Sequence, residues 1–138
     1  MRQEAILLPL AALAGLTFVV LLMIPYARFK AAREGLVAAE DFKYGESPSV
    51  PGSTSIPNRN LMNLLELPVL FYIACLALYV TESVDGLAVA LAWLYFALRV
   101  GHSAIHLTYN KVFHRLSLFA ASNVVLIALW IRLVVRLA

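Results

Sequence analysis

Charged residues are scarce in this sequence. Lys, Arg, Asp and Glu together make up 14% of its 138 residues, whereas 62% are hydrophobic. Because soluble domains contain roughly 25% charged residues, this shortage excludes an ordinary soluble domain and indicates a membrane protein. The net charge of +3 could indicate nucleic-acid binding, but the basic residues flank long apolar runs. That placement is typical of charges that set membrane topology, so we expect no nucleic-acid partner.

Cysteine is almost absent as well. Cys75 is the only one, so no disulfide can form within the chain. It lies in an apolar run, and we interpret it as a packing residue without chemistry. The polar loops are too short to form a second domain, so we expect residues 1–138 to form a single transmembrane domain.

Long apolar runs make up most of the rest. Four of them reach the length of about 20 helical residues that a bilayer requires. We predict helices over approximately residues 6–28, 60–81, 87–109 and 115–136, with a polar loop over 31–58. The first run is longer than the apolar core of a signal peptide, about 7–15 residues, and ends in basic residues, so we expect it to be retained. The predicted fold class is an all-α membrane protein with a bundle of four transmembrane helices.

Proline occurs where the predicted helices are interrupted. Pro48, Pro51 and Pro57 predict that no continuous helix crosses the polar loop. Pro68 lies inside the second predicted helix and predicts a kink there. The short connection at residues 83–86 predicts that the third helix returns antiparallel beside the second.

The lysines and arginines are distributed unevenly along the chain. Most of the eleven lie in or beside the first and third loops: Arg28, Lys30, Arg33, Lys43, Arg59, Lys111 and Arg115. The opposite side has Arg2, Arg132 and Arg136, and Arg99 is intramembrane. The positive-inside rule therefore predicts that both termini lie on the non-cytoplasmic side. We expect a multi-pass protein of a bacterial-type inner membrane or its equivalent, with the long first loop in the cytoplasm.

Polar residues recur on one face of two neighbouring predicted helices. Arg59, Asn63 and Glu66 are spaced i, i+4 and i+7, and Arg99, His102, His106 and Tyr109 are spaced i, i+3, i+7 and i+10. At 1.5 Å per residue, Glu66 lies roughly 7–8 Å and Arg99 roughly 12 Å inside the same membrane face. We therefore predict an ion pair between Glu66 and Arg99, because an unpaired intramembrane carboxylate is unfavourable. The alternative is a purely structural pair that fixes the helix register.

Donor side chains outnumber carboxylates in this region. Arg59, Asn63, Arg99 and Arg115 face a single carboxylate, that of Glu66, which leaves positive charge uncompensated. Such an excess suits an anionic ligand with carboxylates, or a thiolate, that enters from the cytoplasmic side.

These residues resemble the membrane-associated proteins in eicosanoid and glutathione metabolism, the MAPEG family. The resemblance rests on Arg59-x3-Asn63-x2-Glu66 followed by a proline, on Arg99 in the third helix and on Arg115 at the start of the fourth. It implies a bacterial-type member that forms homotrimers, with glutathione as co-substrate between adjacent protomers near the cytoplasmic face. By resemblance, glutathione would be bound by Arg59, Asn63, Glu66 and Arg99. We add His102, His106 and Tyr109 to the predicted glutathione site, because they share the helical face of Arg99. The two histidines stand where eukaryotic synthases carry tyrosines, and Leu67 stands where some relatives have tyrosine.

The resemblance also implies a catalytic role for Arg115, which corresponds to the arginine that holds the glutathione sulfur as a thiolate. A guanidinium in a low-dielectric site lowers the pKa of a nearby thiol, which is near 8.5 when free, about the value for cysteine. The expected function is therefore a glutathione-dependent transferase or peroxidase that acts on lipophilic electrophiles. One alternative is a non-catalytic lipid-binding or scaffold protein of the same fold.

A third alternative is a metal-binding helical bundle. His102 and His106 at i, i+4 could ligate a metal, with Glu66 as a third ligand. The nearby arginines repel a cation, so we expect no metal and assign the histidines to hydrogen bonding with a ligand or with Tyr109.

Overall fold

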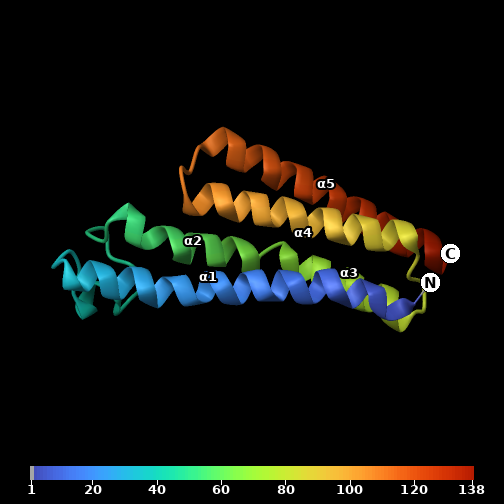
Figure 1. Ribbon diagram of the computed structural model, residues 1–138, viewed down its shortest axis with the longest axis horizontal. Helices are drawn as coiled ribbons and strands as arrows, with labels where there is room; N and C mark the ends of the chain where they lie inside the picture. Colours follow the sequence, from blue (N-terminus) through green and yellow to red (C-terminus); the bar gives the residue numbers. More distant parts are fainter. Residues whose placement is uncertain (1) are drawn as a thin grey trace.

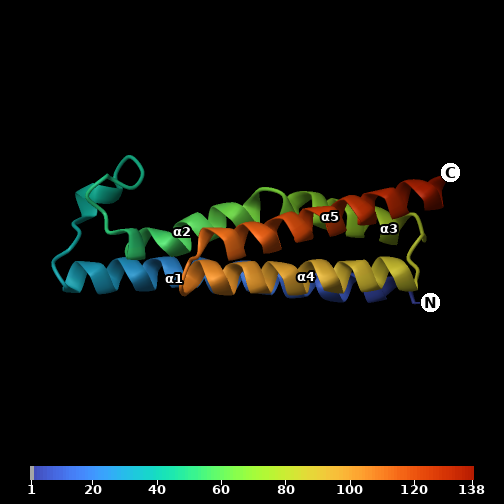
Figure 2. The same ribbon diagram turned by 90° about the horizontal axis from the view of Figure 1, so that it is seen from above.

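The computed structural model describes residues 2–138 of the chain. Over these residues every regular element is helical: η1 Gln3–Ile6, α1 Leu7–Arg33, η2 Ala39–Phe42, α2 Gly52–Leu65, α3 Pro68–Val80, α4 Gly86–Leu107 and α5 Val112–Leu137. Helices α2 and α3 follow one another along nearly the same line, so the elements form four long rods that lie side by side (Figure 1; Figure 2). In the described part, four helical segments are long and apolar enough to cross a membrane: Gln3–Arg33, Gly52–Val80, Gly86–Leu107 and Val112–Leu137. The prediction of an all-α chain with four such helices is confirmed.

The polar loop is shorter than the predicted 31–58. Helix α1 continues to Arg33, and α2 already begins at Gly52 with Pro57 inside it. A proline removes one N–H, which in a helix would bond to the carbonyl four residues earlier, here that of Ser53. Ser53 is exposed at the first turn of α2, where water can satisfy its carbonyl. No continuous helix crosses residues 31–58, as predicted, but Pro57 lies inside α2 and not in the loop.

The second predicted helix is two helices, not one kinked helix. Helix α2 ends at Leu65, Glu66 has ψ −103°, and α3 starts with Pro68 in its first turn. Pro68 has no N–H for the carbonyl of Leu64, and its fixed φ suits the first position of a new helix. The chain crosses the break with two short-range hydrogen bonds, from Val69 N to the Glu66 carbonyl at 3.2 Å and from Leu70 N to the Leu67 carbonyl at 2.9 Å.

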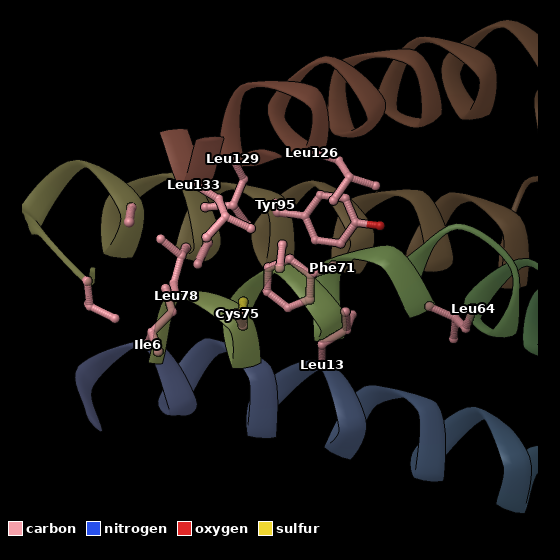
Figure 3. Close-up of a cluster of buried hydrophobic side chains, with 14 of the residues drawn as sticks. Ile6, Leu13, Leu64, Phe71, Cys75, Leu78, Tyr95, Leu126, Leu129 and Leu133 are labelled. Carbon is pink, nitrogen blue, oxygen red and sulfur yellow. The ribbon is translucent and has the colours of Figure 1, made fainter. Parts of the chain in front are cut away.

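The apolar core lies in the half of the bundle that contains α3. The rings of Phe71 and Tyr95 stack with their centroids 4.5 Å apart, and leucines of α1, α3 and α5 surround them (Figure 3). Cys75 is fully buried in this cluster, as its interpretation as a packing residue predicts. The core contains side chains of α1, α3, α4 and α5 and, across the break, Leu64 of α2, so α3 is held in place by side-chain packing.

Both termini lie at one end of the bundle, next to the connection between α3 and α4 (Figure 1). We call this the terminal end and define it by Gln3, residues 81–86 and Arg132. At the opposite end, α1 and α2 project beyond the turn between α4 and α5 (Figure 1; Figure 2). We call this the site end and define it by residues 34–63 and 99–119.

Candidate functional site

A buried polar layer separates α2 from α4 at the site end. It consists of Asn60, Arg99, His102, Ser103 and His106, each at most 4% exposed. The hydroxyl of Ser103 donates to Asn60 Oδ1 at 3.2 Å. Within the described chain, Asn60 Nδ2 and the Nδ1 atoms of both histidines have no hydrogen-bond partner. Buried polar atoms are almost always satisfied, so this layer has donors and acceptors available for a ligand or ordered water.

Arg99 closes the carboxyl end of α2. Its Nη2 donates to the Asn63 carbonyl at 2.9 Å and lies 3.4 Å from Asn63 Oδ1. Carbonyls in the last turn of a helix lack intrahelical partners and carry partial negative charge, which a guanidinium stabilises. The Arg99 Cζ atom also lies 5.9 Å from the centroid of the Phe119 ring. The side chain is fully buried, and its Nε and Nη1 have no partner within residues 2–138.

The predicted ion pair between Glu66 and Arg99 is not formed in the protomer. Over residues 2–138 the ion pairs are Arg2–Glu4, Arg28–Glu46 and Arg132–Asp85. Because α2 ends at Leu65, Glu66 does not continue the helical face that packs against α4. Its side chain is exposed. The same break leaves the Asn63 carbonyl without an intrahelical partner, and Arg99 donates to this carbonyl and not to the Glu66 carboxylate. The helical spacing predicted a shared face, but the backbone is not helical at Glu66.

Two adjoining cavities lie beside the buried polar layer. The first has a volume of about 310 Å³ and is lined by Gly52, Ile56, Arg59, Asn63, His106, Asn110 and Arg115. The second has a volume of about 180 Å³ and is lined by Asn63, His102, Val112, Arg115, Leu116 and Phe119. Asn63 and Arg115 line both, so these two side chains stand at the boundary between a polar and a more apolar space.

Arg115 is held at this boundary by the turn that precedes α5. It lies in the first turn of α5, and its Nη1 donates to Asn110 Oδ1 at 2.8 Å. The guanidinium therefore reaches back over the turn toward the first cavity. Arg59 approaches the same cavity from α2 and is exposed.

Tyr109 lies apart from the other predicted site residues. Helix α4 ends at Leu107, and the chain turns at Asn110, whose φ is +50°. The predicted helical face therefore stops before Tyr109, which is 55% exposed and makes a 3.0 Å hydrogen bond with His114 Nδ1. The prediction that Tyr109 shares the helical face of Arg99, His102 and His106 was wrong for this reason.

The structure thus brings together most of the predicted residues. The two cavities are lined by Arg59, Asn63, His102, His106 and Arg115, with Arg99 behind Asn63. Glu66 and Tyr109 line neither cavity.

Sequence reasoning missed Asn60 and Asn110. Asparagine just beyond a helix is a known signal for a left-handed residue and could have identified Asn110. Asn60 lies three residues before Asn63, and residues three apart share a helical face, so the same spacing rule could have identified it.

The two histidines stand close together on α4. The ring centroids of His102 and His106 are 5.9 Å apart. Among the residues that the structure describes, no three His, Cys, Asp or Glu side chains are grouped closely enough to hold a metal ion.

Comparison with known protein families identifies the family of the chain. The model of the MAPEG family matches residues 6–135. The chain belongs to the MAPEG family. Comparisons with curated proteins and with solved structures returned no match. MAPEG membership and the four spanning helices identify an integral, multi-pass membrane protein. MAPEG proteins generally use glutathione and are generally trimeric, and membership suggests transferase-type or peroxidase-type chemistry in general.

Proposed function

We propose that this MAPEG protein is a glutathione-dependent transferase or peroxidase that acts on lipophilic electrophiles. The observation that carries the proposal is the charge of the first cavity. Of the seven residues that line it, two are arginines and none is acidic. Its volume of about 310 Å³ is within the usual range of about 300–1,000 Å³ for small-molecule sites. Glutathione has two carboxylates and a thiol, which match this excess of donors.

Over residues 2–138, no ion pair involves the two arginines of this cavity. Glu46 pairs with Arg28 at 3.2 Å, and Glu66 lies outside both cavities. Arg59 and Arg115 thus keep their charge available for an anion. Charge-assisted hydrogen bonds from guanidinium to carboxylate are among the stronger polar contacts, and they orient the ligand as well as hold it.

In the proposed reaction, Arg115 stabilises the ionised sulfur of bound glutathione. Arg59 and Asn63 bind the peptide part, and His106 offers an unpartnered ring nitrogen to it. The cationic guanidinium of Arg115 favours the thiolate, the form that attacks an electrophilic carbon. The apolar side chains of Val112, Leu116 and Phe119 lie on the other side of Arg115. Arg99 and His102 support the site from the buried polar layer.

We propose that Glu66 has its role in the assembled trimer. A carboxylate that is exposed in a membrane-spanning segment is unfavourable in lipid, so we propose that a neighbouring protomer of a trimer covers it. There it would bind the amino group of glutathione at the boundary between protomers. We further propose that the site end faces the cytoplasm of a bacterial-type inner membrane, as the basic residues of the first and third loops predict.

A non-catalytic lipid-binding role is the second candidate. An apolar cavity of about 510 Å³ lies between α3 and α5, with Leu67, Leu70, Leu126 and Trp130 among its lining residues. Its apolar lining suits an acyl chain, and binding an acyl chain requires no catalytic residue.

Purified protein tests the two candidates. We expect saturable glutathione binding by calorimetry in mild detergent, and glutathione-dependent conjugation of a small apolar electrophile such as chlorodinitrobenzene. Arg59→Ala should weaken binding by about tenfold or more, because a charged hydrogen bond contributes about 1.5–3 kcal/mol. Lys43→Ala, which removes a charge from the loop outside the cavity, is the matched control. Lipid binding without glutathione binding or turnover would favour the second candidate.

A further inference from the structure

The turn between α4 and α5 contains an asparagine with two separate tasks. Asn110 has φ +50°, and its N–H donates to the Ile105 carbonyl at 2.8 Å. This bond closes the turn that follows Leu107, the last residue of α4, and asparagine tolerates the left-handed conformation better than most residues. The backbone of Asn110 thereby stabilises the turn that connects α4 to α5.

The side chain of Asn110 does something the turn does not require. Its Oδ1 accepts from Arg115 Nη1 at 2.8 Å, and both residues line the first cavity. We propose that Asn110 is a positioning residue that holds the Arg115 guanidinium over this cavity. The proposal rests on the proposed function, in which Arg115 stabilises the thiolate of glutathione.

Arg115 needs such a tether because of where it lies. An arginine has a long, flexible side chain that moves toward water when it lies near the end of a spanning helix. Within residues 2–138, the bond to Asn110 is the hydrogen bond that the structure gives the Arg115 guanidinium, and no ion pair involves it. Without it, the guanidinium could extend into solvent and leave the cavity.

A neutral acceptor suits this task better than a carboxylate. An aspartate at position 110 would also bind the guanidinium, but it would compensate the positive charge that lowers the pKa of a thiol. The other ionisable groups that line the cavity are Arg59 and His106, and neither provides negative charge. Asn110 therefore fixes the position of Arg115 without reducing its effect on the ligand.

Two substitutions separate the backbone task from the side-chain task. Asn110→Gly keeps the left-handed turn and removes the amide. Asn110→Asp keeps an acceptor and adds negative charge. Thr108→Ala is the control, because the Thr108 hydroxyl in the same turn bonds only to the Ala104 carbonyl of its own helix, at 2.6 Å.

The first measurement needs no glutathione. In protein labelled with ¹⁵N-arginine, the Nη resonances of Arg115, assigned from their loss in Arg115→Lys, should be resolved in the native protein. They should average in Asn110→Gly because rotation of the guanidinium is released, and remain resolved in Asn110→Asp and Thr108→Ala.

The second measurement uses the thiol. The pKa of bound glutathione, titrated by the ultraviolet absorbance of its thiolate, should rise in both Asn110→Gly and Asn110→Asp. In Asn110→Gly we expect kcat to fall by about ten- to a hundredfold with little change in KM, because a misplaced group lowers the rate of the chemical step more than ligand binding.

The outcomes distinguish the two hypotheses. If the native protein forms bound thiolate but Asn110→Gly matches it in thiol pKa, kcat and Arg115 resonances, the positioning role is overturned and the proposed function stands. If the native protein binds no glutathione, the proposed function fails, and with it the role of Asn110 toward a thiolate. Averaged Arg115 resonances already in the native protein would overturn the tether by themselves.

Discussion

At the terminal end, the charges of Asp85 and Arg132 and the amide of Gln3 are matched within the protomer, while Arg132 Nε has no partner over residues 2–138. Asp85 accepts from the Ala88 amide at 2.9 Å as the cap of α4 and forms an ion pair with Arg132 of α5. Gln3 exchanges two hydrogen bonds with the backbone of Val84. These contacts use the polar groups for structure, and they tie α5 and the start of the chain to the same turn.

The site end is arranged differently. Arg59 and Arg115 line a cavity with no acidic neighbour in its lining, and both histidines of α4 keep an unpartnered ring nitrogen. Polar groups that a protein leaves unmatched are unfavourable for stability and occur mostly where something binds. Arginines near helix ends are thus paired for structure at one end, whereas at the other they line a cavity without an acidic partner.

Substitution of Arg115, at the site end, should have the largest effect, and the effect should be on kcat. We expect Arg115→Ala to keep the fold and most glutathione binding but to lower kcat by about a hundredfold, the size expected when one group that stabilises developing or fixed negative charge is lost. Arg115→Lys should restore little of it, because the ammonium is shorter in reach and lacks the planar fork. Lys111→Ala, in the same turn but in neither cavity lining, is the control for net charge. Full activity in Arg115→Lys would reduce Arg115 to a topology signal.

Arg99 should give the next largest effect, and it should be on stability. Arg99→Met leaves the Asn63 carbonyl at the end of α2 without its donor, and we expect a loss of about 1.5–3 kcal/mol. Unfolding in detergent, followed by circular dichroism, measures it. Val100→Ala, a truncation at the neighbouring exposed position, should change little. A stability equal to that of the native protein would mean that the break in α2 does not depend on Arg99.

The structure also separates what the sequence could predict from what it could not. Hydropathy predicted four spanning helices, because a run of about 20 apolar residues can be recognised from its length alone. The spacing of Arg59, Asn63, His102 and His106 placed them correctly, since each lies on an intact helix. The same rule failed at Glu66, which lies outside α2, and at Tyr109, which lies past the end of α4.

The failure at Glu66 has a physical cause that lies outside the local sequence. Pro68 was recognised, but a proline alone does not decide between a kink and a break. The outcome depends on whether another side chain satisfies the carbonyls that the break leaves free. Arg99 donates to one of them, that of Asn63, from 36 residues further along the sequence. Contacts between distant segments of this kind are not encoded in a local pattern.

At the terminal end, Asp85 should give a smaller effect than Arg99. Asp85→Ala removes both the cap of α4 and the partner of Arg132, and we expect a loss of about 1–2 kcal/mol with no change in glutathione binding. The pKa of Asp85 is held below its usual value of 3.8, first by the hydrogen bond from Arg132 and then by that from the Ala88 amide. Asp85→Asn keeps the cap and should lose less. An effect of either variant on turnover would contradict the separation of the two ends.

The smallest effect is expected in the loop at the site end, at a carboxylate matched by neutral donors. Asp41 accepts from the Ala38 amide at 2.9 Å and from the hydroxyls of Ser47 and Ser49. These bonds, the Ala38 amide first, lower its pKa from the usual 3.8. Because the pKa is depressed in the folded loop, the stabilisation is present above the ordinary pKa of the carboxyl and is lost as the pH falls through the lower, folded value.

Hydrogen exchange of the Ala38 amide measures the stabilisation of the loop by the Asp41 carboxylate. Its protection, relative to an unstructured peptide at the same pH, should be constant at neutral pH and should fall at acidic pH, below 3.8, the usual pKa of the carboxyl. Asp41→Asn should give lower protection with no such pH dependence, while Glu40→Gln, a neighbouring acidic position that is exposed, should behave like the native chain. Protection that persists in acid would show that Ser47 and Ser49 order the loop without the charge. Because Asp41 lines neither cavity, thiolate formation at Arg115 should not follow its titration, and a shared pH midpoint would mean that the loop and the site are coupled.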